Sequence, residues 1–177
     1  MHDAAVVARV MEDSRAMLAG GLTMESLEAI GHRLAEAGLH QNLVAGSEMR
    51  QMHGGDSSFT VLQTDPDGLT LVFGRFSAKE ETPVHDHGSW GVACVIQGVD
   101  RYRHWEIAGD GTVRVLYERE LGPGAFAAWL DPPADIHSQQ GIGEPALELI
   151  MFGKNVMSLP RHYYDTKTGE VTTALPQ

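Results

Sequence analysis

The 177-residue sequence has little cysteine, few basic residues and no long apolar run. A single cysteine, Cys94, excludes an intramolecular disulfide and a zinc site built from several thiolates. With 13 Lys and Arg against 24 Asp and Glu, the net charge of -11 argues against a surface that binds nucleic-acid phosphates. No apolar run approaches the roughly 18 residues that a membrane helix needs. We therefore expect no nucleic-acid or membrane partner, and a small molecule as the ligand.

The same absences bear on compartment and domain organisation. A lone cysteine that we expect to be buried and inert, together with the lack of a charged-then-apolar leader with a cleavage signal, predicts a reducing, cytoplasmic location. The length fits a single domain over residues 1–177. Within it we expect amino-terminal helices in residues 1–45 and a β-barrel core in residues 57–170.

The distribution of apolar residues predicts two helices followed by many short strands. Apolar side chains recur at helical spacing in residues 3–18 and again after Thr23. From residue 57 onward, short apolar or alternating segments are separated by Asp, Gly and Pro, and turn sequences at residues 65–68 and 109–111 predict hairpins. The expected strands are 59–62, 69–76, 91–96, 102–107, 113–117, 125–130 and 146–152. Strands of this number and spacing predict a mainly β protein, a double-sheet jelly roll or barrel with a ligand site at its mouth.

Three histidines stand out as candidate metal ligands. On a strand, His85 and His87 share a face, with Cα atoms about 6.5 Å apart, while Asp86 points to the other face. Alone, such a His-x-His pair is more often solvated or hydrogen-bonded than metal-binding. The glycine and proline turns around it and the later His137 favour a metal site. Imidazole suits iron, copper, nickel and zinc, and three nitrogens leave coordination positions open.

Several segments, in the same order, resemble the cupin superfamily and within it the bacterial thiol dioxygenases of the cysteine dioxygenase and 3-mercaptopropionate dioxygenase type. The resemblance covers roughly residues 57–170. The segments that carry it are Thr-Pro-Val-His-Asp-His-Gly-Ser-Trp-Gly at 82–91, Asp-Ile-His-Ser at 135–138, Glu-Pro-Ala-Leu at 144–147 and His-Tyr-Tyr-Asp-Thr-Lys-Thr-Gly at 162–169. It implies a cupin double-stranded β-helix (jelly-roll barrel), preceded here by the helical segment.

The resemblance also implies an activity. It makes His85, His87 and His137 ligands of Fe(2+), in an enzyme that transfers both atoms of O2 to the sulfur of a small organic thiol, such as a mercapto acid, and so forms a sulfinate. No organic cofactor is required. Most cupins add a glutamate shortly after His-x-His, where this sequence has Trp90 and Gly91, as the thiol dioxygenases do. Three neutral imidazoles leave the charge of the ion uncompensated, which favours an anionic thiolate.

Further residues receive expected roles from the same resemblance. Arg161 matches the arginine that holds the substrate carboxylate, although a surface arginine beside Pro160 is the plain alternative. Trp90 is a candidate pocket wall or a core residue. The family's Ser, His and Tyr relay is replaced by Glu148, Ile150 and Phe152. Glu148 either faces inward, to meet an amine or act as a base, or forms hydrogen bonds at the rim.

Because the Ser, His and Tyr relay is replaced in this sequence, two other functions remain possible for the same fold. One is a different metal-dependent cupin enzyme, such as an oxygenase, isomerase or hydrolase, which would turn over its substrate without a thiol. Another is a non-catalytic cupin that binds a metal or small ligand, since a fold does not establish a function.

Overall fold

The computed structural model describes residues 3–40, 43, 47–52 and 55–175. Two helices come first, α1 (Ala4–Leu18) and α2 (Met24–Gly38), as the apolar spacing predicted. The Asp3 carboxylate accepts hydrogen bonds from the first backbone amides of α1. Thr23 and Ser26 form a reciprocal capping box at the start of α2. These caps fix where both helices begin.

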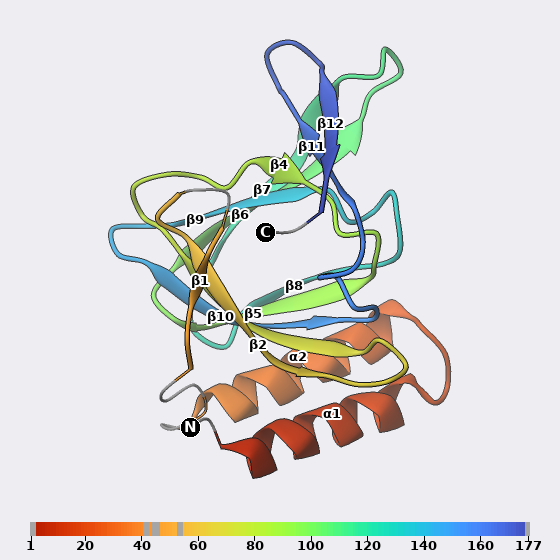
Figure 1. Cartoon of the computed structure of the whole chain (residues 1–177), viewed down its shortest axis with the longest axis vertical. Coiled ribbons are helices and arrows are strands. Elements are labelled where there is room, and N and C mark those ends of the chain that lie inside the picture. The colour runs from red at the N-terminus through yellow and green to blue at the C-terminus, as the bar shows by residue number, and fades with distance from the viewer. Residues whose placement is uncertain (1–2, 41–42, 44–46, 53–54, 176–177) are drawn as a thin grey trace.

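The rest of the chain forms two six-stranded antiparallel sheets (Figure 1). The strands of the first sheet, in spatial order, are β1 (Arg50–Gln51), β2 (Ser58–Thr64), β3 (Thr70–Phe76), β10 (Ala146–Phe152), β5 (Gly91–Gln97) and β8 (Phe126–Trp129). Those of the second are β12 (Val171–Ala174), β11 (Arg161–Tyr164), β4 (Val84–His85), β9 (His137–Gly141), β6 (Asp100–Ile107) and β7 (Val113–Leu121). Both expected hairpins are confirmed, because β2 pairs with β3 and β6 with β7.

The short strands β1, β4, β9, β11 and β12 were not predicted from the sequence. Strand β4 has two residues, too few to show a period, and the sequence of β9, His-Ser-Gln-Gln-Gly, is polar on both faces. Pairing with neighbours, rather than local apolar pattern, makes these segments strands. They matter because β4, β9 and β11 are adjacent in the second sheet.

Two apolar cores lie on opposite faces of the first sheet. The helices pack on its outer face, as Figure 1 shows, and the second sheet faces its inner side. Strand β10 serves both cores by alternation: Leu149 and Met151 pack toward the helices, and Ile150 and Phe152 lie between the sheets. Cys94 belongs to the helix-side core, where burial raises the pKa of its thiol to about 12. The expected buried, unreactive cysteine is therefore consistent with its surroundings.

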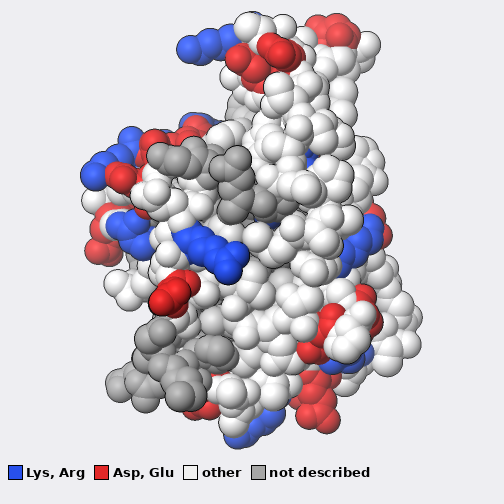
Figure 2. All heavy atoms as spheres, in the orientation of Figure 1, with Lys and Arg blue, Asp and Glu red and all other residues white. Residues whose placement is uncertain are grey.

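Neither helix in the described part of the chain is long and apolar enough to span a bilayer. On the face that Figure 2 shows, Lys and Arg side chains lie among Asp and Glu side chains instead of forming one continuous patch. Exposed ion pairs among the described residues include Lys79 with Asp56 and Arg114 with Glu106.

Candidate metal centre

Sheet pairing brings the three predicted ligands together from segments some fifty residues apart. His85 on β4 lies directly opposite His137 on β9, and His87 follows two residues after His85. One ring nitrogen from each of the three histidines lies within 4.8 Å of the other two, and Nε2 of His87 is 3.3 Å from Nε2 of His137. All three side chains are buried. The arrangement therefore places three imidazoles around one point inside the barrel.

Backbone carbonyls orient two of these rings. Nδ1 of His85 lies 2.8 Å from the carbonyl oxygen of Pro83, and Nδ1 of His137 lies 3.0 Å from that of Asp135. A carbonyl can only accept, so each Nδ1 carries the proton and each Nε2 keeps its lone pair. Burial lowers the pKa of His137 to about 3, so its ring is neutral at ordinary pH. Neutral, oriented imidazoles are what a metal ion requires.

The spacing between two of the three nitrogens also fits an ion. Two nitrogens that are each about 2.1 Å from one ion lie roughly 3.0 to 3.4 Å apart for octahedral to tetrahedral angles. The separation of 3.3 Å between the Nε2 atoms of His87 and His137 falls in that range. This three-histidine site can therefore hold a metal ion.

Two buried aspartates hold the ligand segment in place. Oδ2 of Asp135 accepts hydrogen bonds from the backbone amides of His87, at 3.0 Å, and Gly88, at 2.8 Å. Asp86 points away from the cluster, as strand alternation predicted, and its Oδ2 accepts from Nδ1 of His162 at 2.7 Å and from the Tyr164 hydroxyl at 3.1 Å. These contacts fix the position of the loop that carries His87. They also give His162 a structural role.

A cavity between the sheets opens onto the three histidines. Its wall is mostly apolar, with polar groups contributed by the three imidazoles, Gln139 and Arg161. The lining residues are Met52, Phe59, Val72, Gly74, Phe76, His85, His87, Trp129, His137, Gln139, Ile150, Phe152, Val156, Met157 and Arg161. A few convergent polar groups in an apolar cavity are typical of a small-molecule site.

Arg161 is a buried residue of the cavity wall, not a surface arginine. Strand β11, which it begins, pairs with β4 through Tyr163 and His85 and so brings it close to the metal centre. Its side chain is 7% exposed, and among the described residues its Nε atom has no hydrogen-bond partner. Burial lowers the pKa of the guanidinium, and a hydrogen bond with Tyr163 partly opposes that shift. A buried cation with a spare donor suits an anionic ligand group.

The three residues that the resemblance places at the relay positions separate into two groups. Ile150 and Phe152 line the cavity, and the ring of Phe152 lies 4.6 Å from that of His87. Glu148, the third residue on this face of β10, is fully buried and does not line the cavity. Its Oε2 instead accepts a hydrogen bond of 2.8 Å from Nε2 of Gln139. Glu148 is therefore an interior group, which corrects the alternative of a position at the rim.

Trp90 does not lie in the cavity wall. It belongs to the core between the first sheet and the helices, because it precedes β5 and turns its ring toward that side. Trp129 on β8 takes the place next to the metal centre, with its ring 4.8 Å from that of His137. Sequence reasoning missed Trp129 and Gln139 of the cavity wall. A signal for Gln139 was available, because it lies two residues after His137 and so shares its face of the strand.

Glu148 and Asp100 form a buried pair of acids whose pKa values are both raised. Burial raises the pKa of Asp100 to about 7, and burial followed by the charge of Asp100 raises the pKa of Glu148 well above its ordinary value. In the unfolded chain both groups ionise near pH 4. The folded protein thus holds more protons between about pH 4 and 7. The pair's contribution to stability is greatest at low pH and is lost as the pH rises through the folded pKa values.

We expect the Glu148→Gln variant to lose less stability than the wild type when the pH rises from about 4.5 to about 7.5, because glutamine has no proton to release. The lowered pKa of His137 makes both proteins more stable as the pH rises. The informative quantity is therefore the difference in free energy of unfolding between the wild type and Glu148→Gln. Urea denaturation of both metal-free proteins across this range measures it. The exposed Glu144→Gln variant is the control. Parallel pH curves for the wild type and Glu148→Gln would contradict the assignment.

Comparison with known proteins supports the architecture. No protein-family model and no curated protein matches the sequence. A crystal structure from the set titled DMSP lyases RdDddP and RnDddQII aligns over 77% of this chain and 70% of that one, with 18% identity and a TM-score of 0.52. A Klebsiella pneumoniae protein with a double-stranded β-helix domain aligns over 71% and 89%, with 15% identity and a TM-score of 0.47.

An oxalate oxidase in complex with glycolate aligns over 56% of this chain but 51% of its own, about half of its length, with 19% identity and a TM-score of 0.47. Structural similarity at such low sequence identity shows the fold and nothing more. The observation that defines the fold of this chain is its two facing antiparallel sheets. The chain therefore has a double-stranded β-helix fold, with three buried histidines at a site that can hold a metal ion.

Proposed function

We propose that this protein is an iron-dependent thiol dioxygenase that converts a small organic thiol, such as a mercapto acid, to its sulfinate. The observation that carries this proposal is the composition of the metal centre: the cluster found among the described residues consists of three imidazoles and no carboxylate. Neutral ligands leave the full charge of a divalent ion in place. Such an ion favours an anionic sulfur ligand and lowers the pKa of the thiol.

In this proposal His85, His87 and His137 hold the ion, and ferrous iron, when bound, supplies the redox chemistry that joins O2 to sulfur. The overall reaction balances without another reductant, because one thiol and one O2 give one sulfinic acid. Arg161 binds the substrate carboxylate with its planar guanidinium. Trp129, Ile150 and Phe152 form the apolar wall that excludes water from the reacting sulfur.

The test is oxygen consumption by iron-reconstituted protein with a panel of thiols, with sulfinate detected by mass spectrometry. The panel includes cysteine, cysteamine, 3-mercaptopropionate, mercaptosuccinate and an aromatic thiol. We expect one O2 consumed per thiol and sulfinate as the product for at least one of them, and no consumption by metal-free protein.

The opposite result is equally informative. If iron occupies the three-histidine site and no thiol supports oxygen uptake, the dioxygenase proposal is wrong. The remaining candidates are then another metal-dependent cupin enzyme, which would turn over a substrate that is not a thiol, or a cupin that binds a metal or ligand without turnover.

A further inference from the structure

Among the described residues that line the cavity, one polar side chain, that of Gln139, is neither a candidate metal ligand nor an ion. Gln139 lies on β9 two residues after His137, so both side chains point to the same, inner face. It is 2% exposed and lines the cavity together with the three histidines and Arg161. An uncharged amide at this position would contact any molecule held next to the metal centre.

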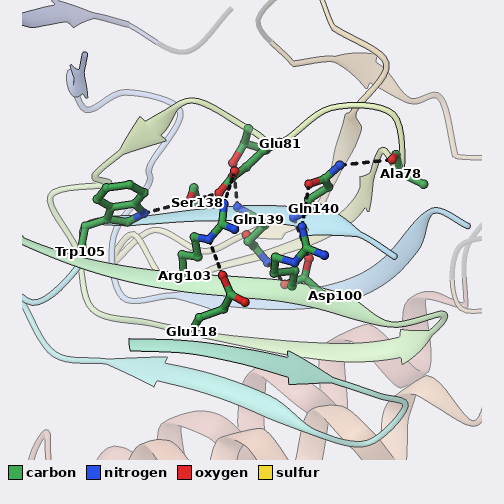
Figure 3. A network of polar contacts seen from close by, with 11 residues as sticks. Ala78, Glu81, Asp100, Arg103, Trp105, Glu118, Ser138, Gln139 and Gln140 are labelled. Atoms are coloured by element: carbon green, nitrogen blue, oxygen red, sulfur yellow. Dashed lines mark hydrogen bonds and ion pairs between the residues drawn. The ribbon is translucent and has the colours of Figure 1, made fainter. Parts of the chain in front are cut away.

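Two buried acids hold the nitrogen of this amide. Nε2 of Gln139 donates to Oε2 of Glu148 at 2.8 Å and to Oδ2 of Asp100 at 3.3 Å. Figure 3 shows Gln139 and Asp100 together within the polar network around β9. The backbone amide of Gln140 donates to the other oxygen of Asp100 at 3.0 Å. The amide nitrogen of Gln139 is thus directed away from the cavity toward carboxyl oxygens.

The acids themselves are joined by one proton. Glu148 and Asp100 are both fully buried, and a side-chain hydrogen bond connects them. Two adjacent carboxyl groups without solvent cannot both ionise. Glu148 is the protonated partner, because burial and the neighbouring charge of Asp100 raise its pKa well above the ordinary value, whereas Asp100 accepts hydrogen bonds from Gln139 and Gln140. With both protons of the Gln139 amide directed to this pair, the amide oxygen remains for the cavity.

We propose that Gln139 is a substrate-binding residue whose amide oxygen accepts a hydrogen bond from a hydroxyl or amino group of the substrate, and that the Glu148–Asp100 pair fixes its orientation. This inference rests on the proposed thiol dioxygenase function and names a specificity determinant of the same site. Arg161 binds the carboxylate, and Gln139 distinguishes thiols that carry a hydrogen-bond donor from those that do not. A fixed acceptor rejects an analogue without the donor because the amide oxygen is then left buried and unpaired.

Three thiols with the same carbon skeleton test this inference. 3-Mercaptopropionate has no donor on its carbon chain, 2-hydroxy-3-mercaptopropionate has a hydroxyl group, and cysteine has an amino group. Calorimetric titration of iron-loaded protein under anaerobic conditions measures binding without turnover. We expect the two donor-bearing thiols to bind about tenfold more tightly than 3-mercaptopropionate. In Gln139→Met, an unbranched apolar replacement, this preference should disappear while binding of 3-mercaptopropionate changes less than about twofold.

Three further variants separate specific recognition from a structural effect. Gln140→Met alters the next residue of β9, whose amide donates to the Ala78 carbonyl outside the cavity, and should keep the preference. Glu148→Gln keeps a donor to Asp100 and an acceptor for Gln139, so it should also keep the preference, whereas Glu148→Leu should reduce it.

Three other results would contradict the inference about Gln139. Equal binding of the three thiols by the wild type refutes the role of Gln139, and this holds even if Gln139→Met does not fold. An equal loss for all three in Gln139→Met also refutes it. A failure of every thiol to bind iron-loaded protein overturns the proposed function and this inference with it.

Discussion

Replacement of His137 by alanine is expected to abolish stoichiometric iron binding. The three imidazoles converge on one point. His137 lies opposite His85 across the sheet, and its Nε2 is 3.3 Å from Nε2 of His87. Without it two nitrogens remain, and the ion loses a ligand whose orientation is already fixed by the Asp135 carbonyl. Iron content per chain, measured after reconstitution and extensive dialysis, gives the result.

The matched control is His32→Ala. His32 lies on α2, against Phe126 on the helix side of the first sheet, and should leave iron content unchanged. A circular-dichroism spectrum identical to that of the wild type would show that His137→Ala still folds. Full iron occupancy in folded His137→Ala would show that the cluster is not the metal site.

Replacement of Arg161 by alanine is expected to raise KM for a carboxylated thiol about a hundredfold while changing KM for an uncharged thiol by a few-fold at most. A bidentate, charge-assisted pair in a buried site supplies this difference, because hydrogen bonds to charged groups contribute about twice as much as neutral ones. Steady-state oxygen uptake with 3-mercaptopropionate and 2-mercaptoethanol measures the two constants.

Two other arginine variants refine the result. Arg161→Lys keeps a positive charge but not the planar fork, so its KM for the carboxylated thiol should lie between those of the wild type and Arg161→Ala. Arg101→Ala removes a guanidinium that contacts Gln140 instead of the cavity and should change neither constant. If Arg161→Ala affected charged and uncharged thiols equally, Arg161 would not be the carboxylate anchor.

Local sequence signals predicted those helices and strands that contain several regularly spaced apolar residues. Helical spacing, with a start near Thr23 for the second helix, predicted α1 and α2, and apolar alternation between turn residues predicted the strands of the first sheet apart from the two-residue β1. The His-x-His spacing predicted that His85 and His87 share a face. The prediction that Asp86 points to the other face is confirmed by its contacts with His162 and Tyr164.

The same signals failed where neighbouring strands, and not local pattern, decide the structure. Strand β4 has only two residues and β9 is short and polar, yet their pairing sets the position of two of the three histidines. From the sequence alone, nothing separates Trp90 from Trp129 as a residue of the cavity wall. Their positions relative to the first sheet separate them, since one packs toward the helices and the other toward the metal centre.

The sequence by itself determined the mainly β architecture, the amino-terminal helices and the identity of the histidine candidates, because these depend on residue type and on spacing along the chain. Tertiary structure alone decided that Arg161 is buried in the cavity wall and that Glu148 and Asp100 meet behind Gln139. The physical reason is that burial and the sharing of a proton depend on which strands lie side by side. Those pairings join residues that are distant in the chain, such as Asp100 and Gly141 across β6 and β9.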